Sequence, residues 1–269
     1  MAIDFSNVIL DTMDTVYCKD ITTGKLLAIM DELQDGTLEN GLDKTYVTGT
    51  GGTRIATLYR NKTATFSCTN TYLSYNALAL QTGTDAKYAS SSSKIVVPTY
   101  EYIVVDTPTT VTLSHVPVGT TGAEVQYVYK TLKDGSPDFS KVLEVDTSAS
   151  AGKFKIEAAS KTLTFNEGDL QKGDTIFVTY DYEDSTAIKI VNEAKTFPKA
   201  CEVIIDCTGR DACDQSITYH VRIVMPNSAV DGAFTLNFGS DAATHPFSCE
   251  ANATKCNNVN TLWECYVVE

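Results

Sequence analysis

The sequence has few of the residue patterns that mark enzymes and metalloproteins. It contains only three histidines, His115, His220 and His245, and none has a second His or Cys at metal-ligand spacing. It also lacks H-E-x-x-H, G-x-S-x-G and a Rossmann glycine set behind a strand. We therefore expect no catalytic site, no metal site and no bound cofactor.

Positive charge and long apolar runs are scarce as well. The chain has 21 Lys and Arg against 34 Asp and Glu, a formal net charge of −13. Duplex-DNA-binding proteins use Lys and Arg to release phosphate counterions, so we expect DNA to be repelled rather than bound. No apolar run approaches the roughly 20 residues of a membrane-spanning helix, and the first residues lack the pattern of a secretory signal. These absences predict a protein made inside a cell, with no membrane partner.

Eight cysteines are present, but their spacing matches no zinc pattern and includes no C-x-x-C. Cys201, Val203, Ile205 and Cys207 share one face of a predicted strand. We expect reduced, buried thiols that behave as small apolar side chains. Disulfides formed after release from the cell are the alternative.

The clearest structural signal is β-strand alternation in the segment 216–238. Its alternating apolar residues are Ile217, Tyr219, Val221, Ile223 and Met225. Pro226 and Asp231-Gly232 then predict a reversal before Phe234, Leu236 and Phe238, so the segment is interpreted as a long hairpin. The C-terminal residues alternate through Trp263, Cys265 and Val267 and predict a strand paired in a sheet.

The remaining N-terminal part is predicted to be mostly strands. Phe5, Val8, Ile9, Met13 and Val16 have helical spacing and predict a short helix or a docked arm. Further along we expect short strands at 16–20 and 25–32, an acidic solvated loop at 31–43, a hairpin of strands 54–60 and 63–70, a capped helix at 72–81, and a strand at 94–105 with Tyr100, Tyr102 and Val104 on one face.

A second β module is predicted over residues 108–185. Short strand-like runs recur there at 110–113, 124–130, 142–146, 153–157, 162–165 and 175–182, separated by turn residues. This spacing is typical of a small sandwich or an Ig-like module. The expected division is therefore one β domain of residues 1–107 and 186–269, interrupted by the module 108–185. One continuous large sheet is the alternative.

The glycine-rich segment 46–54, YVTGTGGTR, is predicted to be a flexible loop. It lacks the G-K-[ST] ending of a phosphate-binding loop, and no apolar strand immediately precedes it. Loops of this composition often become ordered only against a partner.

Several segments together resemble the tail tube (major tail) proteins of tailed bacteriophages. The resemblance lies in KLLAIMDE at 25–32, TLEN at 37–40, the 49–52 loop, ATFSCTNTYLS…LALQTGTD at 64–85 and the terminal LWECYVVE. The segment from Lys153 to Tyr182 is similar to modules of phage structural proteins. The match is spread over most of the chain and includes no catalytic motif.

The resemblance implies a mainly β, tail-tube-type β-barrel or sandwich with one short flanking helix, plus the inserted small β-sandwich (Ig-like) module. It further implies homohexameric rings that stack into the tube through which DNA is ejected, in a virion tail assembled in the host cytoplasm. Sheath, tape-measure and baseplate proteins are expected partners, and DNA passes without specific binding. The expected inter-ring contact residues are Thr48, Gly49, Thr50, Gly51, Gly52, Thr53 and Arg54.

Two other functions remain open at the level of sequence. The first is another virion component, such as a capsid decoration or tail-associated protein, which would share the β-rich composition. The second is a carbohydrate-binding or hydrolytic β-protein, which would need clustered exposed aromatic residues together with paired carboxylates.

Overall fold

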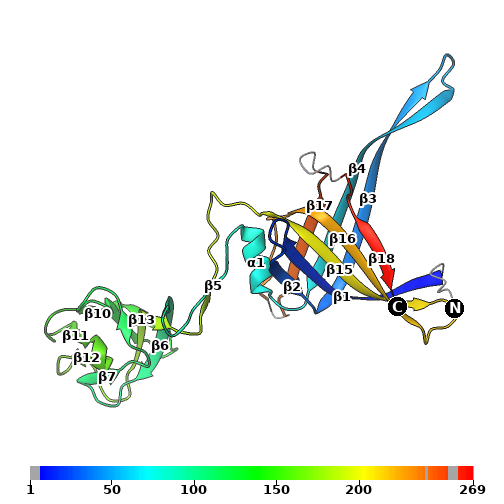
Figure 1. The fold of residues 1–269 in the computed structure, drawn as a ribbon. Coiled ribbons are helices and arrows are strands. Elements are labelled where there is room, and N and C mark those ends of the chain that lie inside the picture. The colour runs from blue at the N-terminus through cyan, green and yellow to red at the C-terminus, as the bar shows by residue number, and fades with distance from the viewer. Residues whose placement is uncertain (1–6, 240–241, 254–259, 269) are drawn as a thin grey trace. The chain divides into compact units, whose positions relative to one another are not determined.

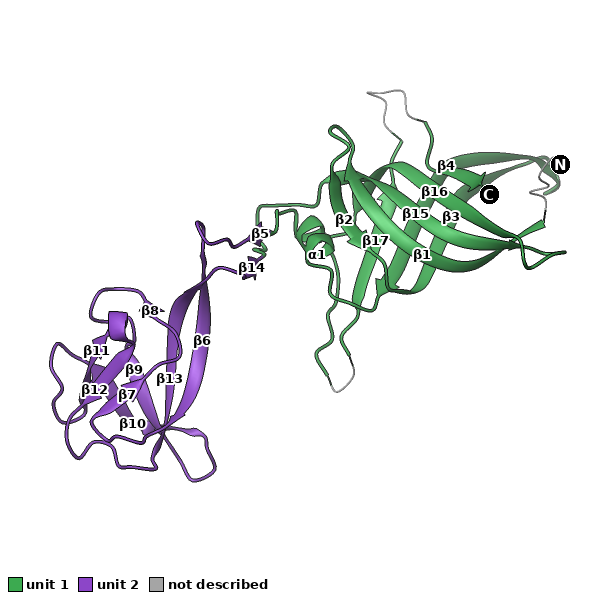
Figure 2. Ribbon diagram, turned by 60° about the horizontal axis from the view of Figure 1, so that its bottom comes forward, with its two compact units in different colours: residues 1–86, 190–269 green, residues 87–189 purple. Residues whose placement is uncertain are grey.

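The computed structural model describes residues 7–239, 242–253 and 260–268, and it is mainly β-structure (Figure 1). The chain divides into two compact units, coloured separately in Figure 2. Unit 1 comprises residues 1–86 and 190–269, and unit 2 comprises residues 87–189. The predicted mainly β fold with one short α-helix is confirmed for the part of the chain that is described.

Unit 1 is built on an antiparallel sheet with the strand order β2-β1-β15-β16-β17-β4-β3, and β18 also pairs with β16. The strands are β1 (Val8–Asp20), β2 (Leu26–Met30), β3 (Leu33–Thr48), β4 (Arg54–Asn70), β15 (Ala200–Asp211), β16 (Thr218–Val230), β17 (His245–Ala251) and β18 (Glu264–Val268). The predicted C-terminal strand is therefore confirmed as β18.

The sheet of unit 1 curls around a single apolar core. The largest side chains in that core are Met30, Phe66, Ile205, Met225 and Phe247, contributed by five different strands. The predicted shared face of β15 is confirmed, because Cys201, Val203, Ile205 and Cys207 are all buried in this core. Alternation with a period of two places these side chains on one face of the sheet. We call the opposite face, which carries Asp206, Arg210 and Arg222, the polar face, and it also includes the buried Ile204.

The only α-helix of the described residues, α1 (Tyr75–Thr82), packs beside β2. Ser74 caps its N-terminus by accepting a hydrogen bond from the Ala77 N–H. Gly83 ends it in the left-handed conformation, with φ of 74°, which a residue with a side chain adopts only at a cost. The predicted helix at 72–81 is thus confirmed, displaced by a few residues.

The predicted N-terminal helix is wrong, because the residues with helical spacing lie in strand β1. The register with β15 shifts between Leu10 and Thr12 and again between Met13 and Thr15. Each bulge inserts an extra residue and breaks the two-residue alternation, which leaves apolar side chains three to five positions apart. That spacing imitates a helix. Phe5, part of the same prediction, lies outside the described residues.

Two further predictions in unit 1 need correction. From Leu33 onward the acidic segment 31–43, predicted to be a loop, forms the first part of β3, and 54–70 is one continuous strand, β4, rather than a hairpin. β3 is an edge strand with mostly exposed side chains, so its sequence carries little apolar alternation. The break predicted after residue 60 does not occur, because β4 continues through Asn61, which adopts a φ of 49°.

The hairpin predicted within 216–238 is also wrong in its second half. β16 continues past Pro226 to Val230, and residues 231–238 form no strand. Pro226 lies where the register between β15 and β16 shifts, between the pairs Val203↔Met225 and Cys201↔Ser228. A proline at a bulge removes no ladder hydrogen bond, which explains why the strand is not interrupted.

Unit 2 has its own sheet, with the order β6-β13-β9-β10-β11-β12-β7 and β8 paired to β13. Its strands are β6 (Ile95–Val104), β7 (Thr110–Thr112), β8 (Pro117–Val118), β9 (Tyr127–Thr131), β10 (Pro137–Val145), β11 (Lys153–Glu157), β12 (Thr162–Phe165) and β13 (Thr175–Asp184). All six strands predicted within 108–185 have a counterpart here. The sheet covers a separate core that includes Leu113, Phe154, Leu163 and Ile176.

Unit 2 begins at Lys87, whereas the sequence predicts that the module starts at residue 108. The reason is that β6 pairs along its whole length with β13, so it belongs to the same sheet as the rest of the unit. A short ribbon of β5 (Lys87–Tyr88) and β14 (Ile188–Lys189) joins the entering and leaving chain segments. Because the two large sheets share no strand, the alternative of one continuous sheet does not apply.

Candidate functional site

A two-stranded arm extends from the sheet of unit 1, as Figure 1 shows. β3 and β4 pair from Leu33↔Asn70 to Thr48↔Arg54, whereas β17 pairs with β4 only at its far end, from Thr65 onward. The residues 41–63 therefore have no third strand beside them among the described residues. We call residues 41–63 the arm.

The seven sequence-predicted contact residues lie together at the tip of the arm. Thr48 ends β3, Arg54 begins β4, and the residues between them form the turn. The Gly49 N–H donates to the Thr53 carbonyl at 2.8 Å, which closes the turn. Gly51 and Gly52 have φ of 94° and 81°, a conformation that favours glycine. The predicted loop is thus a defined hairpin turn, and its role as a contact stays a prediction.

A cation–π contact fixes one side of this tip. The Arg54 guanidinium carbon lies 3.4 Å from the centroid of the Tyr46 ring. Such a contact holds the guanidinium over the ring face and contributes about 0.5–1 kcal/mol at an exposed site. The tip therefore presents a fixed positive charge beside an aromatic ring.

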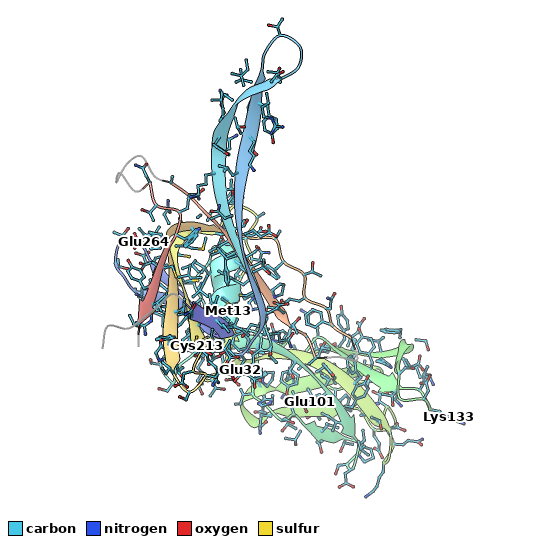
Figure 3. All side chains as sticks on the ribbon, turned by 90° about the vertical axis from the view of Figure 1, so that its right-hand side faces the viewer. Met13, Glu32, Glu101, Lys133, Cys213 and Glu264 are labelled. Carbon is cyan, nitrogen blue, oxygen red and sulfur yellow. The ribbon has the colours of Figure 1, made fainter. Side chains whose placement is uncertain are left out.

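Both faces of the arm expose apolar side chains. The register places Tyr46 and Tyr59 on one face and Val47 and Leu58 on the other, because residues opposite each other in a ladder share a face. Figure 3 shows side chains standing out on both sides of the ribbon. The exposed apolar residues of the arm are Leu42, Tyr46, Val47, Ile55, Leu58 and Tyr59, and Ile55 is 70% exposed.

The sequence pattern did not identify most of these side chains as a surface. Ile55 and Tyr59 were expected in strand 54–60 of a hairpin with strand 63–70. The signal that could have found the arm is the presence of alternating apolar residues on both sides of the glycine turn. Such a pattern is typical of a single hairpin whose two strands pair with each other.

Two other strands of unit 1 leave an edge without a hydrogen-bonding neighbour among the described residues. β2 pairs only with β1, and its Leu26 and Ile29 side chains are exposed. β18 pairs only with β16, and Tyr266 and Val268 are exposed on it. An unpaired edge with exposed apolar residues readily accepts a strand from another chain.

The charged groups on the polar face of the sheet are largely paired. Arg222 Nε on β16 lies 3.2 Å from Asp206 Oδ1 on β15, and Arg210 Nε lies 2.6 Å from Asp11 Oδ2 on β1. These pairs link neighbouring strands, but they are solvent-exposed and contribute little to stability. They also offset part of the acidic charge on this face.

No group of residues in the described part of the chain has the arrangement of a metal centre. The three histidines lie apart: His115 stacks on the Tyr182 ring in unit 2, His220 is exposed on β16, and His245 is buried on β17. No described helix has the length and apolarity needed to cross a bilayer.

The seven cysteines within the described residues are free thiols, and Cys256 lies outside them. Burial raises the pKa of both Cys68 and Cys249 to about 12. Cys18 and Cys201 are hydrogen-bonded to each other, and this contact together with burial raises the pKa of Cys18. A buried thiol with a raised pKa is a poor nucleophile, because the thiolate is the reactive form.

One family model matches the chain over residues 7–263, and it is described as the YomU/Tube protein family. The match covers both units, including the arm and β2, and ends just before β18. No curated protein matches the chain.

Proposed function

Because the chain belongs to the YomU/Tube protein family and is therefore a phage tail tube-type structural protein, we propose that six copies close into a ring and that these rings stack into the tail tube. In this proposal the arm of each copy contacts the next ring. The free edges of the sheet join neighbouring copies within a ring. The tube is the conduit for DNA ejection.

The observation that carries the proposal is the arm with exposed apolar residues on both faces. A two-stranded ribbon alone is at best marginally stable in water. An apolar patch of this kind on a soluble protein commonly marks an interaction site. Other copies of the same chain are the most abundant partner of a tail tube-type protein. Contact with a second copy therefore buries the exposed apolar side chains of the arm.

The sheet edges support closure into a ring. A head-to-tail contact between two different edges repeats around an axis and leaves neither of those two edges free once the ring closes. In unit 1 the edges of β2 and β18 belong to different parts of one sheet, so pairing of the β2 edge with the β18 edge of a neighbour is heterologous. Closure also removes the aggregation hazard of open edges.

The acidic composition supports passage of DNA without binding. A ring of six copies multiplies a formal charge of −13 sixfold. A surface of one charge sign repels a polyanion over about a Debye length, roughly 8 Å at physiological salt. Contacts with sheath, tape-measure and baseplate proteins, and assembly in the host cytoplasm, complete the proposal.

The arm can be removed without touching the core. Replacing residues 42–62 with Asn-Gly joins Gly41 to Thr63, which are paired in the register, through a two-residue hairpin turn. We expect this variant to fold, as judged by circular dichroism and thermal unfolding, and to form no tubes in negative-stain electron microscopy. Wild-type chain assembled in parallel is the control.

The outcomes separate the proposal from its rivals. Tubes of normal length from the shortened chain would show that the arm does not join rings. If the wild-type chain yields only isolated monomers or trimers, a capsid decoration or tail-associated protein becomes the better assignment.

A further inference from the structure

The outer face of the unit 2 sheet carries a cluster of aromatic side chains. Along β13, the residues Ile176, Val178 and Tyr180 point into the core of the unit, so the residues between them face outward. Figure 2 shows the neighbouring strands β6, β13 and β9 that carry most of these outward residues. Glu101, labelled in Figure 3, marks the middle of β6. The outward cluster consists of Tyr100 and Tyr102 on β6, Tyr129 on β9, Phe139 on β10 and Phe177 on β13.

The rings of this cluster hold one another in place. The register aligns Tyr102, Phe177 and Tyr129 across three strands, and the Phe177 centroid lies 4.9 Å from that of Tyr102 and 6.3 Å from that of Tyr129. Tyr100 lies 5.8 Å from Phe177 and is nevertheless 65% exposed. Phe139 packs against Tyr129 and is 78% exposed. Mutual packing at these separations fixes the rings, so a ligand that covers them meets a preformed surface.

A polar hollow of about 390 Å³ adjoins the aromatic cluster. The strand β13 pairs with β9 at Ile176–Val178 and with β8 at Asp181–Tyr182. Between these two pairings, beside Thr179, the chain that connects β8 to β9 lines the hollow. Tyr100 is paired directly with Thr179, so the cluster and the hollow are continuous. The volume lies within the range of small-molecule sites, which is about 300–1,000 Å³.

The hollow is lined by hydrogen-bonding groups, two of them carboxylates. Its polar lining residues are Thr99, Thr120, Glu124, Gln126, Thr179 and Asp181, with the Tyr127 ring at its wall. Glu124 accepts a hydrogen bond from the Gly122 N–H at 3.0 Å, which fixes one carboxylate oxygen and leaves the other available. The hollow lining contains no lysine or arginine.

This combination of groups matches a sugar chain. A pyranose ring has a flat face of C–H bonds that covers an aromatic ring, and hydroxyl groups around its rim that donate to carboxylate, amide and hydroxyl oxygens. The two carboxylates repel phosphate- and sulfate-bearing chains, since no cation lines the hollow. Exposed aromatic residues and two carboxylates therefore occur together on this face, a combination that the sequence alone did not locate. We propose that this face of unit 2 binds an uncharged hexopyranose oligosaccharide, with Tyr100 stacking on a sugar ring and Asp181 accepting from its hydroxyl groups.

Titration calorimetry of the full-length chain tests the proposal. The probes are cellohexaose, maltohexaose and chitohexaose, with a sulfated heparin oligosaccharide as the charged comparison. We expect at least one uncharged probe to bind, and Tyr100→Ala to weaken that binding at least about tenfold. We expect Asp181→Ala to weaken it about threefold or more. Tyr72→Ala is the matched control, because Tyr72 is 62% exposed but lies in unit 1, and it should leave the affinity unchanged.

Three results would overturn the proposal. The first is no heat of binding with any uncharged probe up to about 10 mM. The second is binding of the sulfated probe alone. The third is a Tyr100→Ala chain that unfolds at the wild-type temperature and binds the uncharged probe as tightly as wild type. Tube formation is scored on the same samples, so a failure of sugar binding is distinguished from a failure of assembly.

Discussion

His245 on β17 and Gln81 on α1 join the helix to the sheet of unit 1: the imidazole Nε2 lies 2.7 Å from the Gln81 Oε1. The other ring nitrogen, Nδ1, accepts a hydrogen bond from the Ser74 N–H at 3.2 Å. The Gln81 amide nitrogen in turn donates to the Pro246 carbonyl. With Nδ1 accepting, Nε2 carries the proton and donates to Gln81. A neutral imidazole therefore satisfies every partner around it.

This arrangement predicts that unit 1 loses stability below about pH 6.5. Burial lowers the pKa of His245 from its ordinary value of 6.5. As the pH falls, the unfolded chain therefore takes up a proton before the folded chain does, and this favours unfolding. Protonated Nδ1 would also face the Ser74 N–H, donor against donor. We expect the urea midpoint at pH 5.5 to be lower than at pH 7.5.

Substitution of His245 gives the control for this pH dependence. His245→Gln should cost about 1–3 kcal/mol at pH 7.5, because buried partners lose their hydrogen bonds, yet it should flatten the change between the two pH values. His220→Gln, at an exposed histidine, should keep the wild-type pH dependence. An equal pH dependence in the His245→Gln and wild-type chains would contradict the assignment of this pH dependence to His245.

The sequence predicted those strands whose two faces differ. β16 was recognised because its alternate residues point into the core, and the same is true of β15. The arm strands were not recognised as a pair because both of their faces meet solvent in the single chain. Without a buried face, the apolar alternation beside the glycine turn predicts a strand but does not show which strand pairs with it.

The aromatic face of unit 2 shows a second limit of the sequence. The alternation in β6 predicted that Tyr100, Tyr102 and Val104 share a face, and all three side chains are exposed. The alternation alone does not tell whether such a face meets the core or the solvent, since both arrangements have a period of two. Only the pairing with β13, whose Ile176 and Val178 fill the core from the opposite face, decides the direction.

A second prediction concerns the contact between Met13 on β1 and Gly36 on β3. A Cβ atom added to Gly36 would lie 2.4 Å from the Met13 Cε, so the end of the Met13 side chain packs directly against the Gly36 backbone. We expect Gly36→Val to lower the free energy of unfolding by about 1 kcal/mol, the low end for overpacking, because the flexible end of the Met13 side chain can shift. Urea unfolding monitored by circular dichroism measures the change.

A double-mutant cycle distinguishes this overpacking from an effect on strand propensity. Met13→Ala removes the side chain that the new Cβ meets, so the Gly36→Val cost should shrink in that background. Gly239→Val is the control, because a Cβ at Gly239 meets nothing within 4 Å. Equal costs of Gly36→Val with and without Met13 would show that the contact is not responsible.

A third prediction separates the two faces of the arm. Tyr46→Ser with Tyr59→Ser removes the aromatic face, and Val47→Ser with Leu58→Ser removes the aliphatic face. Each pair lies in exposed positions, so we expect the free energy of unfolding to change by about 1 kcal/mol or less per residue, including the lost contact between Arg54 and Tyr46. Each pair should nevertheless raise the protein concentration at which tubes first grow, as measured by sedimentation.

The matched control for the arm changes aromatic residues elsewhere in unit 1. Tyr72→Ser with Phe238→Ser removes a similar exposed apolar area, since these side chains are 62% and 86% exposed. It should leave the concentration for tube growth at the wild-type value. If the control raises that concentration as much as the arm variants do, general solubility rather than the arm governs assembly.

The fourth prediction concerns the hydrogen bonds around Glu101 in unit 2. The Tyr180 hydroxyl donates to the Glu101 carboxylate, which also accepts from the Ser114 N–H at 3.1 Å and from the Ser114 hydroxyl at 3.0 Å. The Tyr180 oxygen itself accepts from the His115 N–H. Burial and the neighbouring carboxylate raise the pKa of Tyr180, so its hydroxyl stays protonated as a donor throughout the neutral range. The four residues tie β6, β13 and the segment after β7 together.

Tyr180→Phe should therefore destabilise unit 2 by about 1–3 kcal/mol, because a carboxylate loses a donor and a backbone N–H loses its acceptor. Hydrogen exchange measured by mass spectrometry locates the effect: amides within 87–189 should exchange faster, while those of unit 1 keep their rates. Tyr182→Phe, which retains the ring stacked on His115, is the control and should change exchange less. Faster exchange spread equally over both units would instead mean that the chain unfolds as one cooperative body, against the separate cores of the two sheets.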